Sequence, residues 1–557
     1  MTGGSPLHVR WLGRVPYREA LGLQQGLFAH GRDQHLLLLE HPHVFTHGPH
    51  ADLARNLRCV PATVGAELVE VQRGGDVTYH GPGQLVGYPI LNLAPKHGDA
   101  GAADVRAYVT SLEQLVIDVL AELGLAGAGR LDEHPGVWVD SNGVSPRKIC
   151  AIGVRTGRGS SDRRTMHGFA LNVATDLAYL RTHIVPCGID RYDVTSLAEE
   201  GVSATMRDVV DVVARLATRR FGAGEGTRAD VAWRLVPEDL SPFSRGERPP
   251  GSPSRRESRR AEAGVTGGLT IAARKPEWIR PKVTIDAAVL ATRRTVRDLG
   301  LVTVCEEAGC PNLSECWAEG TATFMVLGER CTRACGFCLV DTRKPGSVDD
   351  DEPERVAEAV ALMGLEYAVL TMVARDDLAD DGMPHVAACV RAIRARCPGT
   401  SVEVLVSDAR GSESLDVVLH ERPDVFNHNL ETVARLQRAV RPSAGYARSL
   451  SVLARASVAG LTVKSGIIVG MGETEHEMRE ALVDLASVGT NIVTIGQYLR
   501  PTEAHLPVAR WVEPAEFVRL AAFGESIGIA HVEASPLTRS SYHAKEAQRR
   551  SLPLLPA

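Results

Sequence analysis

Six cysteines lie within 34 residues, in two groups of three with different spacings: Cys305, Cys310 and Cys316, then Cys331, Cys335 and Cys338. Thiolates at short spacings on a loop can hold iron–sulfur clusters, whereas structural zinc prefers four tetrahedral ligands. Three ligands on a four-iron cluster leave one iron open, and an open iron can bind and cleave a small molecule. Zinc and a disulfide knot are the alternatives, although the number and spacing fit neither well.

A second set of reactive residues lies in the N-terminal part. A glycine-rich stretch at 73–89 carries His80, Lys148 follows an arginine, and Cys187 stands between a proline and a glycine. Cysteine forms thioesters readily, because its thiolate is nucleophilic and leaves easily. Lys148 can lower the pKa of such a thiol as a cation, or act as a base if burial depresses its own pKa. The competing interpretation is a buried cysteine near a turn and a surface lysine.

Composition narrows the class of protein. The 557 residues predict two to four domains, and the formal charge of -6 gives no sign of nucleic-acid binding. The N-terminus has no apolar signal region, and no run of about 18 apolar residues follows, so we expect a cytoplasmic protein without membrane contact. In that reducing compartment four cysteines are expected to be buried fillers: Cys59, Cys150, Cys389 and Cys397.

The segment Ser241–Gly268 divides the chain. Gly, Pro and Ser fill 14 of its 28 positions and no apolar period survives, which is typical of a flexible linker. Its six arginines can touch RNA or an acidic partner, but a solvated spacer is the favoured interpretation. We therefore expect one domain over 1–222, an extension and linker over 223–272, and a second domain over 273–557.

The two parts of the chain differ in the strands and helices that they predict around these residues. In the first part, apolar runs at 35–40 and 84–93 predict strands, and the spacing over 105–123 predicts a helix with Asp104 as N-cap and Gly124 past its end. This indicates a mixed α/β or α+β domain. In the second part, strands expected at 367–373, 402–406, 425–427, 463–469 and 492–495 alternate with helices expected at segments such as 384–396, 431–440 and 475–488. That alternation predicts a parallel sheet, as a closed or partial barrel with the cysteine stretch beside its mouth.

Several motifs follow the cysteine stretch: RDDL at 375–378, FNHNLETV at 426–433, KSGIIVGMGE at 464–473, TIGQYLRPT at 494–502 and RSSYHA at 539–544. With that stretch they resemble lipoyl synthase, from about Lys275 to about Ala544. The resemblance implies a radical S-adenosylmethionine (SAM) enzyme with a (βα) barrel, partial or full, and two 4Fe–4S clusters. Two local departures, TMVA before RDDL and ASPLT before RSSY, concern the substrate side and not the cluster cysteines.

The resemblance implies different roles for the two cysteine groups. The cluster of Cys331, Cys335 and Cys338 chelates SAM through its open iron and cleaves it reductively to a 5'-deoxyadenosyl radical. The cluster of Cys305, Cys310 and Cys316 is consumed as the donor of two sulfurs to C6 and C8 of an octanoyl chain. Its fourth ligand is a serine of RSSY, which we place on Ser540 with Ser541 as the alternative. An alkoxide is a harder, weaker partner for iron than a thiolate, which suits a cluster that is dismantled.

Cofactor contacts are expected beside these clusters. Gly470 and Gly472, with Gly466, follow a strand, as a close approach of the backbone to adenosine requires. Asn429 and Glu431, with His428, can hydrogen-bond the cofactor or substrate. A simple turn and a polar cluster at a strand end are the competing interpretations of these two groups.

In the N-terminal part, the motifs RGGDVTYHGPGQLVGYP at 73–89, RKICAIGVR at 147–155, HGFALNV at 167–173 and PCGI at 186–189 resemble lipoyl(octanoyl) transferase, over about 7–222. This implies an α/β acyltransferase fold of the biotin/lipoate protein ligase type. Cys187 matches the nucleophile that takes octanoate as a thioester, and Lys148 matches its dyad partner. The residues expected at the acyl pocket are Arg73, Gly74, Gly75, His80, Gly81, His167 and Gly168, and the histidines are assigned no catalytic step.

Together the two resemblances imply a bifunctional enzyme of lipoate biosynthesis. Its partners are octanoyl-acyl carrier protein, the lipoyl domains of 2-oxoacid dehydrogenases and of glycine cleavage H protein, and an electron donor such as ferredoxin or flavodoxin. One alternative joins the radical half to an inactive or ATP-dependent lipoate ligase-like domain. Another is a non-catalytic cluster protein that carries electrons or binds a partner.

Overall fold

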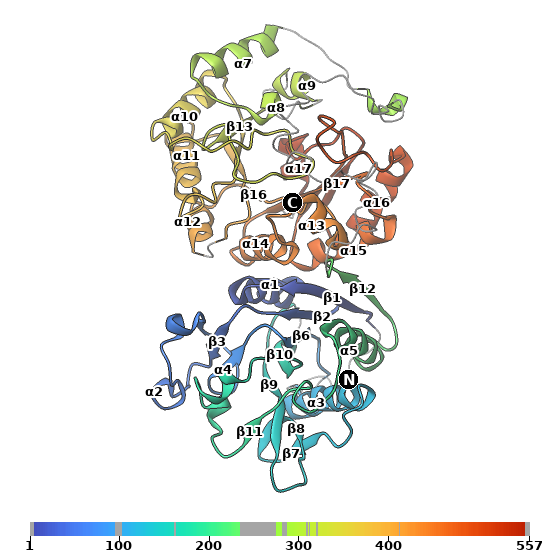
Figure 1. The fold of residues 1–557 in the computed structure, drawn as a ribbon. Coiled ribbons are helices and arrows are strands. Elements are labelled where there is room, and N and C mark those ends of the chain that lie inside the picture. The colour runs from blue at the N-terminus through green and yellow to red at the C-terminus, as the bar shows by residue number, and fades with distance from the viewer. Residues whose placement is uncertain are drawn as a thin grey trace, which may run out of the picture. The chain divides into compact units, whose positions relative to one another are not determined.

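The computed structural model describes residues 5–94, 103–160, 163–233, 275–280, 287–307, 310, 312–318, 321–410 and 413–551. Contacts divide the chain into two compact units, Met1–Val231 and Ala232–Ala557 (Figure 1). The expected linker, Ser241–Gly268, lies outside the described residues, and the expected domain limits stay predictions. Within the described ranges, no helix combines the length and the apolar character needed to cross a membrane.

The N-terminal unit is an α/β domain. Its elements are β1 (Leu7–Arg14), α1 (Tyr17–His30), β2 (Gln34–Glu40), β3 (Val44–His47), α2 (Leu53–Asn56), η1 (Pro61–Val64), β4 (Glu67–Glu70), β5 (Thr78–His80), β6 (Gln84–Ile90), α3 (Val105–Glu122), β7 (Gly129–Leu131), β8 (His134–Val139), β9 (Arg147–Gly157), β10 (Arg164–Asn172), α4 (Ala178–Arg181), η2 (Pro186–Gly188), β11 (Asp193–Val194), α5 (Met206–Phe221) and β12 (Gly226–Asp230).

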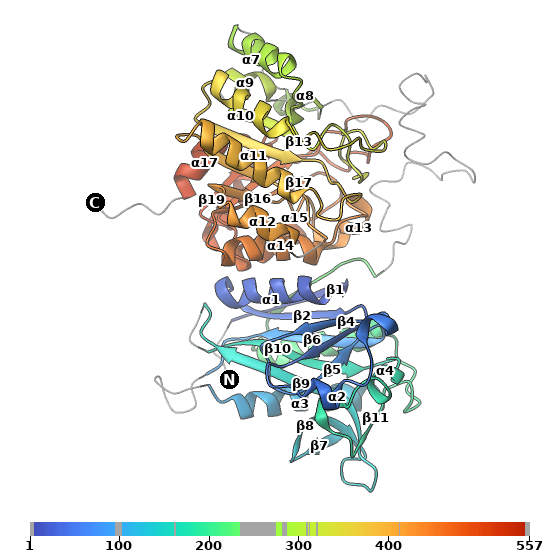
Figure 2. The same ribbon diagram turned by 90° about the vertical axis from the view of Figure 1, so that its left-hand side faces the viewer.

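Its main sheet has the strand order β12-β1-β2-β6-β10-β9-β8-β7, with β11 paired to β9, and a small sheet has the order β4-β3-β5. Helix α1 packs on one face of the main sheet, while α3 and α5 pack on the other (Figure 2). The expected strands and helix of this part are confirmed to within a few residues, since they correspond to β2, β6 and α3. The Asp104 side chain caps α3 by accepting a hydrogen bond from the Ala107 N–H.

The C-terminal unit alternates strands and helices. Its elements are η4 (Glu277–Ile279), α7 (Ala287–Asp298), α8 (Val304–Glu307), α9 (Leu313–Ala318), β13 (Thr321–Val326), α10 (Glu352–Leu362), β14 (Tyr367–Met372), α11 (Met383–Arg396), β15 (Ser401–Leu405), α12 (Ser414–His420), β16 (Val425–Asn427), η5 (Ala434–Leu436), α13 (Gln437–Val440), α14 (Tyr446–Val458), β17 (Val463–Val469), α15 (Glu475–Ser487), β18 (Ile492–Gln497), α16 (Pro514–Ser526), β19 (His531–Ala534) and α17 (Ala544–Ser551).

All seven strands are parallel and follow chain order from β13 to β19, which confirms the predicted parallel sheet. Among the described residues the edge strands β13 and β19 are not paired to each other, so the sheet is the partial form of the expected barrel. The predicted helix over 431–440 is wrong in its first turn. Glu431 instead pairs with β17, because its N–H donates to the Gly466 carbonyl and its own carbonyl accepts from the Ile468 N–H.

A charged network is buried inside this sheet. Lys464 Nζ on β17 lies 3.0 and 3.1 Å from the two carboxylate oxygens of Glu403 on β15, and both side chains are 0% exposed. The hydroxyl of Tyr367 and the amide of Asn427 each donate a further hydrogen bond to Glu403, at 2.8 Å. These bonds connect strands β14 to β17, and Glu403 also lines the cavity described below.

Replacing Lys464 with Met should destabilise the C-terminal unit by about 3–5 kcal/mol, because it leaves the Glu403 carboxylate buried without its counter-ion. Chemical denaturation, monitored by hydrogen exchange in peptides from β15 and β17, measures this change in the free energy of unfolding. The double variant Glu403→Leu, Lys464→Met should recover most of the loss. As a control, Arg519→Gln breaks an exposed pair with Glu475, whose side chains are 53% and 31% exposed, and should cost under about 1 kcal/mol. A Lys464→Met cost as small as the control's would contradict this account of the network.

Candidate active sites

In the N-terminal unit, the structure brings together Lys148 and Cys187. Lys148 is held on β9 and is only 6% exposed, and its Nζ lies 3.8 Å from the Sγ of Cys187 and 5.1 Å from the centre of the Trp138 ring. Cys187 lies in the short helix η2 with a left-handed backbone, φ 55° and ψ 23°. Its N–H donates to the Val77 carbonyl at 2.9 Å. A non-glycine residue in this conformation is uncommon and is typical of functional sites.

Beside Cys187 lies a cavity of about 50 Å³. Cys187 itself lines it, with six of the seven residues expected at the acyl pocket: Arg73, Gly74, Gly75, His80, His167 and Gly168. The remaining walls include Tyr17, Tyr88 and Phe169. Gly81 does not line the cavity, because it packs against Tyr79, whose hydroxyl would lie 1.8 Å from a side-chain carbon added there. Tyr17 belongs to α1, and no local motif of the sequence identifies it.

Two histidines that line this cavity, His80 and His167, are neutral, as is His41, whose ring centre lies 5.7 Å from that of His80. His41 Nδ1 donates to the Val15 carbonyl at 2.7 Å, which leaves Nε2 to accept from the Tyr88 hydroxyl at 2.7 Å. Burial lowers the pKa of His41 to about 4, and burial with the nearby Arg73 and Arg155 lowers that of His167 to about 4. Burial holds the pKa of His80 well below its usual range. At neutral pH the rings of His80 and His167 are uncharged wall residues, and the absence of a catalytic step for them stays a prediction.

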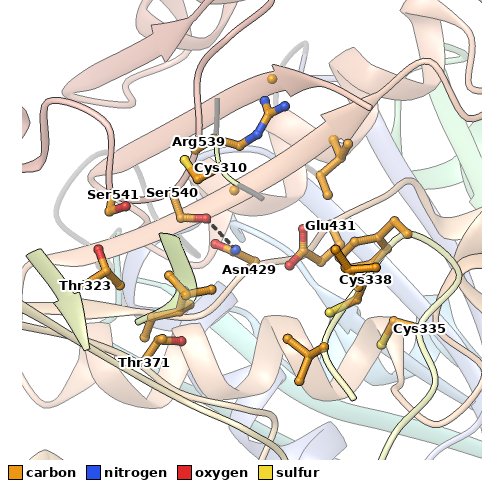
Figure 3. A pocket seen from close by; sticks show the side chains of 18 of the residues that line it. Cys310, Thr323, Cys335, Cys338, Thr371, Asn429, Glu431, Arg539, Ser540 and Ser541 are labelled. Atoms are coloured by element: carbon orange, nitrogen blue, oxygen red, sulfur yellow. Dashed lines mark hydrogen bonds between the residues drawn. The ribbon is translucent and has the colours of Figure 1, made fainter. Parts of the chain in front are cut away.

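In the C-terminal unit, a cavity of about 660 Å³ lies at the carboxyl ends of the strands. Both cysteine groups reach it, since Cys331, Cys335, Cys338, Cys305 and Cys310 line it together with Asn429, Glu431, Ser540 and Ser541 (Figure 3). Cys316, Gly470 and Gly472 are not among its lining residues. All eleven cysteines of the chain are free, which excludes the disulfide alternative in this structure.

The loop of Cys331, Cys335 and Cys338 is braced by neighbouring segments. The N–H groups of Arg333 and Ala374 lie 3.4 and 3.3 Å from the Cys331 Sγ. His505 Nε2 donates to the Cys338 carbonyl at 2.9 Å. Burial raises the pKa of the Cys331 thiol, and that of Cys338 to about 12. Three half-buried cysteines on one loop, whose thiols can release their protons on binding a metal, fit the ligand set of an iron–sulfur cluster.

Asn429 and Glu431 follow β16 and line the same cavity, where Glu431 lies next to Cys338 (Figure 3). Burial raises the pKa of Glu431, although Arg441 and a hydrogen bond from Asn429 oppose this shift. Glu431 has a left-handed backbone, with φ 68°. The Asn429 Oδ1 is buried and has no hydrogen-bond partner in the structure. A buried carboxylate beside an unsatisfied acceptor fits a ligand that presents hydroxyl donors, such as the ribose of SAM.

The glycines within and just after β17 divide into two groups. Gly466 lines the cavity. Gly470 instead forms a turn, with φ 98°, in which its N–H and that of Met471 donate to Glu473 at 2.6 and 2.9 Å. Gln497 Nε2 would lie 2.1 Å from a side-chain carbon added at Gly470. The close backbone approach to a ligand is therefore available at Gly466, while the geometry of Gly470 matches the turn interpretation.

Cys305 and Cys316 are buried near the RSSY motif. Cys305 is 3% and Cys316 7% exposed, and burial raises the pKa of Cys305 to about 12. Burial lowers the pKa of the Arg539 guanidinium, an effect opposed by the neighbouring Cys310. Ser540 Oγ accepts a hydrogen bond from Asn429 Nδ2 at 2.7 Å. Cys305, Cys310, Arg539 and Ser540 all line the cavity, whereas Cys316 is buried outside its lining, and the cysteines with the hydroxyl fit the ligand set of an iron–sulfur cluster.

The two units match different families. Residues 16–217 match the lipoyl protein ligase A/B catalytic domain, and residues 325–485 match the radical SAM superfamily. The lipoyl synthase of Methylococcus capsulatus is 52% identical over 277 residues, which cover 49% of this chain and 86% of that protein. The lipoyl synthase of Leifsonia xyli subsp. xyli is 50% identical over 289 residues, which cover 52% of this chain and 88% of that protein.

Among solved structures, a bi-partite lipoate protein ligase from Thermoplasma acidophilum is similar with a TM-score of 0.34 and 16% identity, over 41% of this chain and 88% of that chain. Because this score is low, the family match over residues 16–217 is the basis on which the N-terminal unit is identified.

The buried histidines predict that acid destabilises the N-terminal unit. A folded pKa near 4 for His41 and His167, against about 6.5 in the unfolded chain, gives stability that is complete above pH 6.5 and is lost as pH falls toward 4. Each such histidine contributes up to about 1.4 kcal/mol per pH unit in this window. Urea midpoints, read by hydrogen exchange in peptides from β2 and β6 of the full chain, should fall accordingly.

His41→Gln should reduce the slope of the free energy of unfolding against pH by up to about 1.4 kcal/mol per pH unit, because one buried titrating group is removed. The control His50→Gln changes an exposed histidine and should leave the slope as it was. An equal slope in the His41 variant and the unsubstituted chain would show that His41 does not carry the effect.

Proposed function

The chain belongs to the lipoyl synthase family through its C-terminal unit and carries a lipoyl protein ligase A/B catalytic domain in its N-terminal unit, and from this premise we propose that it makes protein-bound lipoyl groups in two steps. The N-terminal unit transfers octanoyl from acyl carrier protein to a lysine of a lipoyl domain. The C-terminal unit inserts two sulfurs at C6 and C8 of that chain. The observation that carries the first step is the 3.8 Å contact between Lys148 and Cys187.

In the first step, the Cys187 thiolate attacks the carbonyl carbon of the octanoyl thioester. The bond between this carbon and the carrier's sulfur breaks, and the carrier leaves as a thiol after taking a proton from the Lys148 ammonium. The acceptor lysine then attacks the thioester on Cys187, and Lys148, now an amine, takes the proton that the acceptor loses. An amide forms and the Cys187 thiolate is regenerated.

The cavity beside Cys187 suits an acyl chain. Its walls combine Tyr17, Tyr88 and Phe169 with histidines that stay neutral, so it presents little charge to an apolar tail. Arg73 is the exception, but its guanidinium is held by the carbonyl and hydroxyl of Thr46, at 2.8 and 3.0 Å. We expect this arrangement to exclude water from the thioester.

In the second step, Cys331, Cys335 and Cys338 hold a 4Fe–4S cluster that, when bound, supplies the electron for reductive cleavage of SAM. Asn429, Glu431 and Gly466, which line the same cavity, would hold SAM. Cys305, Cys310, Cys316 and Ser540 hold a second cluster, which is the sulfur substrate. The apolar part of the cavity lining, including Met372, Val373 and Leu405, surrounds the octanoyl chain.

The partners follow from this chemistry: octanoyl-acyl carrier protein, lipoyl domains including that of glycine cleavage H protein, and a reductant such as ferredoxin or flavodoxin. A second candidate function, ATP-dependent lipoate ligation by the N-terminal unit, belongs to the same family of catalytic domains. Such a ligase needs no cysteine nucleophile, so the pairing of Cys187 with Lys148 favours transfer from a carrier thioester.

Incubation with octanoyl-acyl carrier protein should add one octanoyl group to the full chain, seen by intact-mass analysis. Cys187→Ser should abolish this adduct, and Lys148→Met should slow its formation by about 10²- to 10⁴-fold, the range of a lost proton-transfer catalyst. Cys150→Ser removes a buried cysteine of the same strand as Lys148 and should keep the adduct. Transfer that persists in Cys187→Ser but depends on ATP would favour the ligase instead.

The two cysteine groups should separate SAM cleavage from sulfur insertion. In anaerobically reconstituted protein with an octanoylated lipoyl domain, Cys335→Ala should stop both the release of 5'-deoxyadenosine and the mass gain of the acceptor. Cys310→Ala should keep 5'-deoxyadenosine release but stop the mass gain, because only the sulfur substrate is missing. Loss of SAM cleavage in a Cys310→Ala protein that retains its other cluster would contradict this division.

A further inference from the structure

One hydrogen bond joins the two halves of the C-terminal cavity. The Asn429 amide nitrogen donates to Ser540 Oγ at 2.7 Å, across 111 residues of sequence (Figure 3). Glu431, on the side of the proposed SAM contacts, lies next to the Asn429 side chain (Figure 3). In Figure 3 the Asn429 amide lies between Ser540, which neighbours Cys310 and Arg539, and Glu431, which neighbours Cys338. The amide therefore donates to a residue of one proposed site and lies beside a residue of the other.

The backbone at Asn429 is held firmly in place. The Arg441 guanidinium donates to the carbonyls of Asn429 and Leu430, at 3.0 and 3.2 Å. The preceding residue, His428, donates its backbone N–H to the Lys464 carbonyl at 3.1 Å. The side chain has room only because residue 466 is glycine, since an added carbon there would lie 2.8 Å from Asn429 Oδ1.

The serine segment is held from the other side. Asn312, which lies between Cys310 and Cys316 in sequence, is 4% exposed and donates from its side chain to the Leu537 carbonyl at 2.8 Å. The Gln497 N–H donates to the Pro536 carbonyl at 3.3 Å. The segment that carries Ser540 is thus tied to the three-cysteine segment through its backbone, while the Ser540 side chain is oriented by Asn429.

We propose that Asn429 is a positioning residue for Ser540, which orients this hydroxyl so that it completes the ligand set of Cys305, Cys310 and Cys316. This inference rests on the proposed function. When the hydroxyl binds iron as an alkoxide, the same amide N–H donates to a negatively charged oxygen, and such a bond is stronger than one to a neutral hydroxyl. Asn429 does not titrate, so it favours the bound form of Ser540 without supplying or removing a proton.

The test uses the full chain with the first cluster removed by Cys331→Ser, Cys335→Ser and Cys338→Ser, called the triple variant below. After anaerobic reconstitution with iron and sulfide, the rate of iron release to a chelator reports on the remaining cluster, and its Mössbauer spectrum reports on the ligands. Asn429→Ala should raise the release rate about tenfold to a hundredfold, as expected for losing a hydrogen bond to a charged group. Gly466→Ala should act in the same direction, because the added methyl group displaces the Asn429 amide.

Three further variants distinguish positioning from general disruption. Asn429→Ala combined with Ser540→Ala should release iron no faster than Ser540→Ala alone, because both changes remove the same ligand. Ser540→Cys should restore slow release in the Asn429→Ala background, because a thiolate binds iron without help from the amide. The control Ser526→Ala, which changes an exposed serine of α16, should change the rate by no more than about twofold.

The outcomes separate this inference from the proposed function. If the triple variant folds but binds no iron, both are contradicted. If it binds a cluster whose release rate is unchanged by Asn429→Ala, or if the effects of Asn429→Ala and Ser540→Ala multiply, only the role of Asn429 is contradicted. The same series in the chain with all six cysteines, read as iron retained after a fixed exposure, tests the inference if the triple variant does not fold.

Discussion

The C-terminal site depends on the pairing of one arginine with two aspartates. Arg333 lies between Cys331 and Cys335, and its guanidinium contacts the carboxylate of Asp376, which follows β14, and that of Asp408, which follows β15. Arg333 is 5% exposed at its side chain and Asp408 is 0% exposed, so these charges have little water to compensate them. Because the loop is fixed to the ends of two strands, its three thiols are held in place by the sheet itself.

The same sheet explains how polar chemistry is placed in an apolar interior. Parallel strands are covered on both faces, so their residues are mostly apolar and buried. The exceptions, Glu403 and Lys464, are paired with each other and with neutral donors, so no charge is left uncompensated. The strands can therefore carry apolar cavity walls along their length, while the cysteines and Ser540 lie in the segments before β13 and after the strands.

The N-terminal site depends on a different constraint, the position and surroundings of its Cys187 thiol. In the proposed transfer Cys187 must be accessible to two successive substrates, and its left-handed backbone places its thiol 3.8 Å from the Lys148 amine and in the cavity lining. The surrounding histidines are buried and neutral, so Lys148 and Arg73 supply the positive charge near the thiol. This arrangement suits transfer of an apolar acyl group. Further charges in the cavity wall would lose their water when the acyl chain binds, at a high cost in free energy.

Much of the fold and of the reactive residues could be predicted from the sequence, because the signals are local. Apolar spacing predicted α3 with its Asp104 cap and the alternating strands of the parallel sheet, and the short cysteine spacings indicated two sites of three thiols. Tertiary structure decided which distant residues meet. The hydrogen bond of Asn429 to Ser540, the position of Tyr17 at the acyl cavity and the separation of Gly466 from Gly470 have no local signature. The helix predicted over 431–440 was wrong at its start for the same reason, since pairing with β17, a contact distant in sequence, overrides the local preference of Glu431.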